Sequence, residues 1–362
     1  MNRMRQLNGL LLALWLPISP VCLAQNLKVG DVLQSPASQV SNPQKAVFTA
    51  VTRAGERLVA VGERGLVLLS DDNGRHWRQA LVPVSVSLTS VRFADEKSGW
   101  VVGHAGVVLA SRDGGESWTL QLDGVRAAKL ELLAAQRDLA DAVDADAAQS
   151  RVQAAERMLA EPPDKPFLAL AISDPGHVLV VGAYGLAMRT DDAGASWRSV
   201  MGQLDNPSGL HLYAIARQGD AWLLAGEQGY LARALDGEHF QQLESGYPGS
   251  LFTMATRADG AVLIGGLKGN AFVLGPDAVT PEPLPTLAGV SFTDAIPLSG
   301  GRVLLANQAG GLFASSDGRL AAFHEPLRKP VSGVVEAGDG SLVFAGFTGL
   351  SRIASPAASV SE

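Results

Sequence analysis

The chain has 362 residues, of which 47% are hydrophobic and 18% are charged, so it is long and apolar enough to bury a large core. Its formal net charge of −7 argues against a nucleic-acid partner, because phosphate backbones favour basic surfaces. The single cysteine excludes a disulfide bond within one chain, and forty glycines spread along the sequence indicate many turns.

Residues 1–24 have the features of a secretory signal. Two arginines precede a run of seven apolar residues at 10–16, and Cys22-Leu23-Ala24 offers small residues before a cut after Ala24. The run is too short to span a bilayer, so we expect a periplasmic or otherwise exported protein that is soluble after cleavage. Lipid attachment to Cys22 is the alternative, although the preceding Ser-Pro-Val fits a lipoprotein signal poorly.

The remainder, 25–362, contains seven copies of one unit: two apolar residues, Gly-x-x-Gly and a further apolar residue. Successive second glycines are 41, 79, 44, 40, 41 and 39 residues apart, so the second interval contains an insertion. A period of about 40 with four short apolar segments, here called strands A to D, is typical of a propeller blade. We therefore predict an all-β, seven-bladed β-propeller. Asn307 replaces the first glycine of copy six, which we attribute to its tolerance of positive φ.

The turn between strands C and D has a conserved form in the first three blades: SDDNGRHW, SRDGGESW and TDDAGASW. We predict that the aspartate accepts N–H groups of its own turn, that the glycine is left-handed, and that the tryptophan on strand D packs on a neighbouring blade. A calcium loop is disfavoured, because each copy has one regular acidic position. The predicted structural residues are Asp72, Gly74, Trp77, Asp113, Gly115, Trp118, Asp192, Gly194 and Trp197.

Residues 125–161 lack glycine and proline and carry apolar residues at helical spacing. We predict a helical hairpin, about 126–143 and 147–160, inserted between blades 2 and 3, with a capping box beginning at Asp146. One long helix is the alternative. Four aspartates near the tip are interpreted as a solvated helix face, so we expect no metal site and no cofactor.

The seventh copy has strands A to C but no D. A strand near 29–34 is predicted to complete it and close the ring, because an open sheet edge would otherwise be exposed.

The segment VRFADEKSGWVVGHAGVVLASRDGGESW closely resembles the repeat of the photosystem II assembly and stability factor family, whose members are exported seven-bladed propellers with BNR-type Asp-box turns. The glycine pattern extends the resemblance through blade 7. The resemblance implies a non-catalytic assembly or stability factor that holds an integral membrane protein or envelope complex. Similar proteins outside photosynthetic lineages are associated with exporters of the resistance-nodulation-division type, which suggests a transporter as the partner.

One face of an up-and-down propeller carries the B–C turns, and we expect the helical insertion to rise from it. These turns vary strongly, as a recognition surface on a fixed frame should. We expect a monomer outside its complex, with no nucleic-acid partner and no small-molecule substrate. The predicted partner-binding residues are Glu63, Arg64, His104, Tyr184, Glu227, Gln228, Lys268, Gln308 and Phe347.

Two other functions share the Asp-box propeller. A sialidase-like glycoside hydrolase needs a convergent arginine cluster, but Arg53, Arg217 and Arg257 belong to blades 1, 4 and 5. We therefore expect no enzymatic activity. A carbohydrate-binding propeller with its ligand in the channel mouth stays open as an alternative.

Export should remove residues 1–24, so the mass of the mature protein should correspond to a chain that begins at Gln25. Mass spectrometry of protein from the cell envelope tests this. A fatty-acyl mass on Cys22 would contradict it and would place the protein on a membrane anchor.

Overall fold

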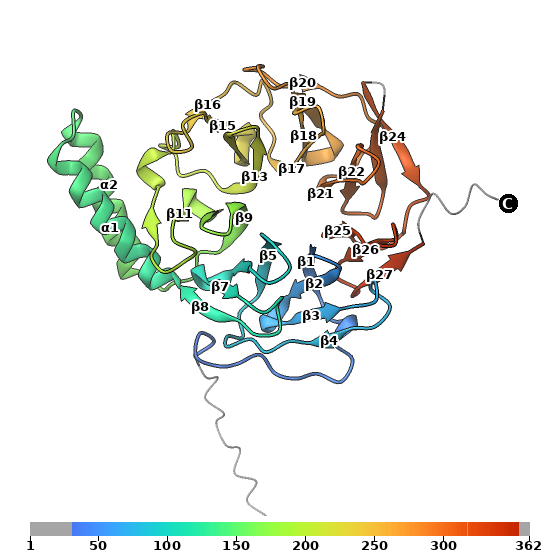
Figure 1. Ribbon diagram of the computed structural model, residues 1–362. Helices are drawn as coiled ribbons and strands as arrows, with labels where there is room; N and C mark the ends of the chain where they lie inside the picture. Colours follow the sequence, from blue (N-terminus) through green and yellow to red (C-terminus); the bar gives the residue numbers. More distant parts are fainter. Residues whose placement is uncertain (1–30, 317, 355–362) are drawn as a thin grey trace, which may run out of the picture. The chain divides into compact units, whose positions relative to one another are not determined.

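The computed structural model describes residues 31–316 and 318–354, which form seven antiparallel sheets arranged as a ring. In each sheet the strands follow one another from the centre outward in the order A to D, and the inner strands line the centre (Figure 1). The predicted seven-bladed β-propeller is therefore confirmed. None of the described helices is long and apolar enough to cross a membrane.

The first three blades have four strands each. Blade 1 consists of β1 (Phe48–Ala54), β2 (Arg57–Gly62), β3 (Val67–Ser70) and β4 (Arg78–Gln79). Blade 2 consists of β5 (Leu88–Phe93), β6 (Gly99–Gly103), β7 (Val108–Ser111) and β8 (Thr119–Leu122). Blade 3 consists of β9 (Phe167–Asp174), β10 (His177–Gly182), β11 (Ala187–Thr190) and β12 (Arg198–Ser199).

The other blades follow the same plan, except that blade 7 has three described strands. Blade 4 consists of β13 (Leu212–Gln218), β14 (Ala221–Gly226), β15 (Leu231–Ala234) and β16 (Gln241–Gln242). Blade 5 consists of β17 (Leu251–Thr256), β18 (Val262–Gly266), β19 (Ala271–Leu274) and β20 (Glu282–Pro283). Blade 6 consists of β21 (Phe292–Pro297), β22 (Val303–Asn307), β23 (Leu312–Ser316) and β24 (Arg319–His324). Blade 7 consists of β25 (Gly333–Glu336), β26 (Leu342–Ala345) and β27 (Ser351–Ile353).

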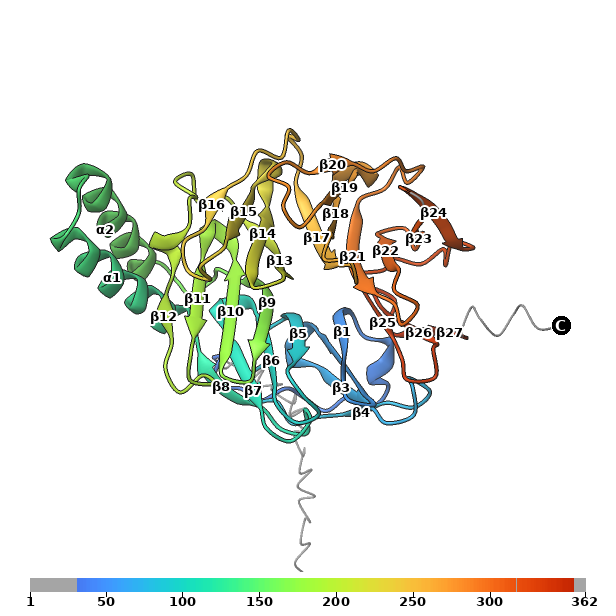
Figure 2. The same ribbon diagram turned by 45° about the horizontal axis from the view of Figure 1, so that its top comes forward.

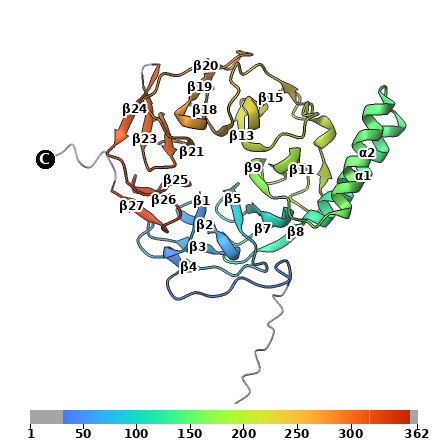
Figure 3. The same ribbon diagram turned by 180° about the vertical axis from the view of Figure 1, so that it is seen from behind.

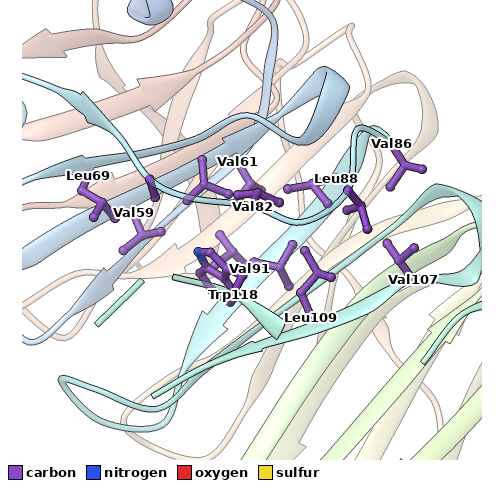
Figure 4. Close-up of a cluster of buried hydrophobic side chains, with 14 of the residues drawn as sticks. Val59, Val61, Leu69, Val82, Val86, Leu88, Val91, Val107, Leu109 and Trp118 are labelled. Atoms are coloured by element: carbon purple, nitrogen blue, oxygen red, sulfur yellow. The ribbon is translucent and has the colours of Figure 1, made fainter. Parts of the chain in front are cut away.

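Apolar clusters between neighbouring blades form the core. Between blades 1 and 2, Val59 and Leu69 pack against Val91, Leu109 and the ring of Trp118 (Figure 4). Because B strands contribute buried side chains to both faces of their sheet, each blade shares one cluster with the blade before it and another with the blade after it. Full burial of one such aliphatic side chain contributes about 1.5–3 kcal/mol to folding.

The chain between β8 and β9 forms two helices, α1 (Gly124–Ala140) and α2 (Ala145–Ala160), and not one long helix. Asp123 and Asp144 cap them by accepting hydrogen bonds from the backbone N–H groups of Arg126 and Ala147. The predicted cap, Asp146, is therefore wrong by two positions. It lies in the first turn of α2, where its charge is still favourable to the helix dipole.

The helical hairpin lies against the outer edge of blade 3 and not above the face from which it starts (Figures 1 and 2). Glu131 of α1 is only 2% exposed; its carboxylate accepts hydrogen bonds from Arg151 of α2 at 2.8 Å and from the hydroxyl of Ser199 on β12. Ala127 and Leu130 add apolar contacts to the cluster shared by blades 2 and 3. The hairpin thus covers strand D of blade 3, which corrects the expectation that it rises over the B–C turns.

The second glycine of each B–C turn presses against the chain that leads into the next blade. A Cβ atom on Gly229 or Gly269 would lie 1.7 Å from the carbonyl oxygen of Tyr247 or Ala288. In blade 2 the neighbouring backbone is that of Gly124, where α1 begins. Across the seven blades φ of this glycine lies between +64° and +99°. Both the contact and the backbone conformation therefore require glycine.

The first glycine of the repeated unit is required for close packing and not for a left-handed backbone. Gly62 has an extended backbone with φ −159°, and a Cβ there would lie 2.1 Å from the carbonyl oxygen of Val47. Asn307, which replaces this glycine in blade 6, is likewise not among the residues with positive φ. Its side-chain oxygen instead accepts hydrogen bonds from the N–H groups of Ala309 and Gly311. The explanation of Asn307 by positive φ is therefore wrong.

Blade 7 closes the ring by packing directly on blade 1 (Figure 3). The Ser332 hydroxyl donates to the carbonyl oxygen of Phe48 at 2.7 Å, and the N–H of Leu350 donates to that of Gln44 at 2.9 Å. The predicted closing strand is wrong for its described part, because residues 31–34 form a turn beside blades 1 and 2. Positions 29 and 30 lie outside the described residues.

The C–D turns have the predicted hydrogen bonds. Asp113 accepts the N–H of Ser117 at 3.0 Å, and Ser111 links the aspartate to the N–H of Gly115. The three glycines of these turns have φ of +82°, +87° and +87°, as predicted. The tryptophans precede strand D instead of lying on it; Trp118 and Trp197 pack on the preceding blade.

The C–D turn of the fourth blade lacks this sequence pattern but still has an aspartate that accepts backbone N–H groups. Leu235 occupies the expected aspartate position and is exposed, while the next residue, Asp236, accepts the N–H groups of Glu238 and His239. These bonds and the bond to the His239 ring hold the pKa of Asp236 well below its usual range.

Gly269→Ala should lower the free energy of unfolding by about 2–5 kcal/mol, through left-handed strain and a clash with the Ala288 carbonyl. Gly301→Ala is the matched control: Gly301 has φ +78° against +79°, but no atom lies within 4 Å of its Cβ position. It should lose only about 1–2 kcal/mol. Equal losses in urea unfolding would show that close approach of the backbone is unimportant.

Asp192 should make stability depend on acid pH. Hydrogen bonds from the hydroxyl and N–H of Ser196 and from Thr190 lower its pKa to about 2, below the value of about 3.9 for an unfolded chain. Since the folded pKa is the lower one, the contribution to stability is complete above about pH 4 and is lost as the pH falls toward 2. Urea midpoints of Asp192→Asn should therefore vary less with pH in this range than those of the wild type.

Candidate partner-binding face

The two sides of the ring are built from different turns. The A–B and C–D turns meet on one side, where the N–H of Ala193 donates to the carbonyl of Gly176; we call it the C–D face. The B–C turns and the connections between blades meet on the other side, where the N–H of Gly65 donates to the carbonyl of Val86; we call it the B–C face.

The B–C turns share one backbone conformation but carry different side chains. In blades 1 to 5 the second turn residue is left-handed, with φ between +53° and +58°; these residues are Arg64, Ala105, Tyr184, Gln228 and Lys268. All nine predicted partner-binding residues lie in these turns. Seven of them are exposed, with Tyr184 and Phe347 each 59% exposed, while Glu63 and Glu227 are half-buried.

A row of aromatic rings crosses this face from the blade 3 turn to the inner strands of blades 4 and 5. The Tyr184 ring meets the His211 ring at 4.7 Å, His211 meets Tyr213 at 6.3 Å, and Tyr213 meets Phe252 at 5.3 Å, between centroids. The Lys165 ammonium lies 5.7 Å from the centre of the Tyr184 ring. Burial and the negative charge of Glu227 raise the pKa of Tyr213, so its hydroxyl stays protonated.

The aromatic row forms where three blades lack an inner-strand hydroxyl residue that the other four blades have. At the second position of the inner strand segment, blades 1, 2, 6 and 7 have a hydroxyl residue that donates to a carbonyl of the next blade, at 2.6–2.9 Å; these residues are Thr49, Thr89, Thr293 and Ser332. Blades 3, 4 and 5 have Leu168, Tyr213 and Phe252 there, all half-buried. One arc of the channel mouth is therefore hydroxyl-lined and the opposite arc is apolar.

Several cations on this face form no ion pair among the described residues, although Lys165 pairs with Glu161 and Asp164 at 2.6 and 3.4 Å. Exposed basic residues at or beside the turns of blades 5, 6, 7 and 1 form no ion pair within the part of the chain that the structure describes; they are Lys268, Arg328, Lys329, Lys45 and Arg64. On the C–D face several arginines are paired with carboxylates, as in Arg57–Asp71, Arg217–Asp220, Arg257–Asp259 and Arg352–Asp339. The net negative charge of the chain therefore does not exclude unpaired positive charge on this face.

The structure brings only some of the predicted residues together. Tyr184 and Glu227 both contact His211, Tyr184 through its ring and Glu227 by accepting the His211 N–H at 3.2 Å. No side-chain hydrogen bond or ion pair among the described residues joins Arg64, His104, Gln308 and Phe347 to them. Sequence reasoning missed His211, Tyr213 and Phe252, although alignment of the strand A positions would have shown an aromatic where other blades have threonine.

The arginines considered for a sialidase-like site are engaged elsewhere. Arg53 pairs with Glu56 at 2.9 Å, Arg217 stacks on Trp222, and Arg257 pairs with Asp259. Within residues 31–316 and 318–354 no cluster of three His, Cys, Asp or Glu side chains is placed to hold a metal ion.

Residues 70–134, from the C–D turn of blade 1 into helix α1, match the family model described as photosynthesis system II assembly factor YCF48. This match confirms the resemblance noted from the repeats over that stretch of the chain. No curated protein sequence matches the chain significantly.

Solved structures extend the likeness of fold to most of the chain. The structure described as YCF48 bound to D1 peptide has 18% identity and a TM-score of 0.62, covering 89% of this chain and 99% of that one. YCF48 from Cyanidioschyzon merolae has 16% identity and a TM-score of 0.60, covering 88% and 99%. The WD40 propeller domain of Doa1 has 11% identity and a TM-score of 0.60, covering 90% and 96%. At these identities the likeness shows the propeller fold alone.

Proposed function

We propose that the protein is a non-catalytic assembly or stability factor that binds an integral membrane protein through its B–C face. The observation that carries the proposal is the row of aromatic rings from Tyr184 to Phe252 on a rigid frame, beside cations without partners. Aromatic side chains that are already held in place supply much of the binding energy of protein interfaces, because they bury area with little loss of freedom.

The comparisons support this role. The family model that matches residues 70–134 carries the description of an assembly factor, and one propeller of the same fold holds a peptide of the D1 protein. The signal-like residues 1–24 support export to the periplasm, where the propeller would meet its partner from the aqueous side. The resemblance noted in the repeats makes a transporter of the resistance-nodulation-division type the partner that we propose to test first.

The charges suggest how the partner is recruited. Unpaired cations such as Lys268 and Arg64 attract an acidic segment and raise the association rate, while the aromatic row determines how long the complex lasts. Binding should therefore weaken as salt increases, chiefly through slower association.

Tyr184→Gly should weaken partner binding by about tenfold or more, because it removes the exposed ring of the aromatic row. It should leave the free energy of unfolding within about 1 kcal/mol of the wild type, since glycine suits the φ of +58° at this position. The measurement is retention of the membrane-protein partner from detergent-solubilised envelopes, with identification by mass spectrometry and thermal midpoints in parallel.

Ala193→Gly is the matched control, because Ala193 lies in the C–D turn of the same blade with φ +59°. It should retain the partner fully. If Ala193→Gly loses the partner while Tyr184→Gly keeps it, the binding face is the opposite one.

The aromatic row could also stack on sugar rings, so a carbohydrate-binding propeller is the second candidate function. A glycan array separates the two: a saccharide that binds the wild type but not Tyr184→Gly would favour it over a protein partner.

A further inference from the structure

The centre of the ring holds a cavity that the proposed function does not use. It has a volume of about 570 Å³, within the range of small-molecule sites. Inner strands of six blades line it toward the C–D face, and most of its wall is apolar, including Ile215, Met254, Ile296 and Val334. It therefore lies at the other end of the channel from the aromatic row.

Three charged side chains line this cavity, and two of them are satisfied by the protein. Arg53 pairs with Glu56 at 2.9 Å. The carboxylate of Glu336 accepts the N–H of Ser299 at 2.7 Å and its hydroxyl at 2.9 Å. Arg92, the third, is exposed to the cavity and has no ion-pair partner among residues 31–316 and 318–354.

The only described acceptor for the Arg92 guanidinium is the carbonyl of Val91, the residue before it, at 3.1 Å. A guanidinium has five N–H donors, so most of those of Arg92 have no described protein partner. The charge of Arg92 acts on Asp294, whose carboxylate accepts hydrogen bonds from the N–H groups of Val334 and Ala295 at 2.8 and 2.9 Å. Burial raises the pKa of Asp294, and the positive charge of Arg92 opposes this rise without contact.

We propose that this cavity binds a carboxylate with an apolar body, in which the carboxylate meets Arg92 and the body lies on Ile215, Met254 and Ile296. A carboxylate matches the planar guanidinium with two parallel hydrogen bonds. The ligand carries one negative charge, because Glu336 on the same wall would repel a second. The carboxylate can belong to a small amphiphile or to the C-terminus of a polypeptide, which has the same chemistry.

The mature protein should be titrated calorimetrically with octanoate and with octanamide, which has the same length but no charge. Octanoate should bind and octanamide should bind at least about tenfold more weakly. Arg92→Gln should lower the affinity for octanoate about tenfold. Arg217→Gln is the matched control, since Arg217 lies one residue before the end of the inner strand of blade 4, on the same face, but does not line the cavity. The octanoate affinity of this variant should equal that of the wild type.

The source of the carboxylate is distinguished by a short apolar peptide, Ala-Leu-Leu, used as the free acid and as the C-terminal amide. Displacement of octanoate by the acid but not by the amide assigns the site to chain termini, whereas displacement by neither assigns it to small amphiphiles. The proposal is overturned if octanoate does not bind, if octanamide binds equally well, or if Arg92→Gln leaves the octanoate affinity unchanged. Tyr184→Gly should not alter octanoate binding, so this test is independent of the B–C face.

Discussion

The fold depends on one repeated contact, the approach of the second B–C glycine to the backbone that enters the next blade. The Cβ positions of Gly65, Gly269 and Gly349 lie within 1.7–2.3 Å of a neighbouring carbonyl oxygen, which leaves no room for a side chain. The same contact joins blade 7 to blade 1 through Gln44, and within residues 31–316 and 318–354 no strand is shared between the two ends of the ring. It also holds the start of the helical hairpin, at Gly124, beside the turn of blade 2.

Because this contact is made by backbone, the other turn residues are free to vary. The four blades with a hydroxyl in the second inner position connect one blade to the next through it, from blade 6 through blade 2. Blades 3 to 5 are relieved of that hydrogen bond and place Tyr213 and Phe252 at the channel instead. The channel mouth is therefore asymmetric, with hydroxyl side chains on one arc and apolar or aromatic side chains on the opposite arc, although the backbone of the blades repeats.

Features that depend on a locally repeated sequence pattern were predicted correctly from the sequence. Spacing of glycines gave seven blades, and the composition of 125–161 gave two helices. Packing between distant segments was not predictable in the same way: the hairpin covers blade 3 because Glu131 meets Ser199, 68 positions away. The aromatic row was missed because Tyr184, His211 and Phe252 lie on three successive blades and come together only when these blades pack side by side. In the turn of blade 4 Asp236, one position later, accepts the N–H groups in place of the missing aspartate.

The central claim is that the B–C face meets a membrane protein, and site-specific photocrosslinking in the intact cell envelope tests it most directly. A photoreactive phenylalanine analogue replaces Tyr184 on the B–C face or Ala193 on the C–D face of the same blade. The account predicts a crosslink to an integral membrane protein from position 184 and none from position 193. A membrane-protein crosslink from position 193 alone, with position 184 silent, would contradict it.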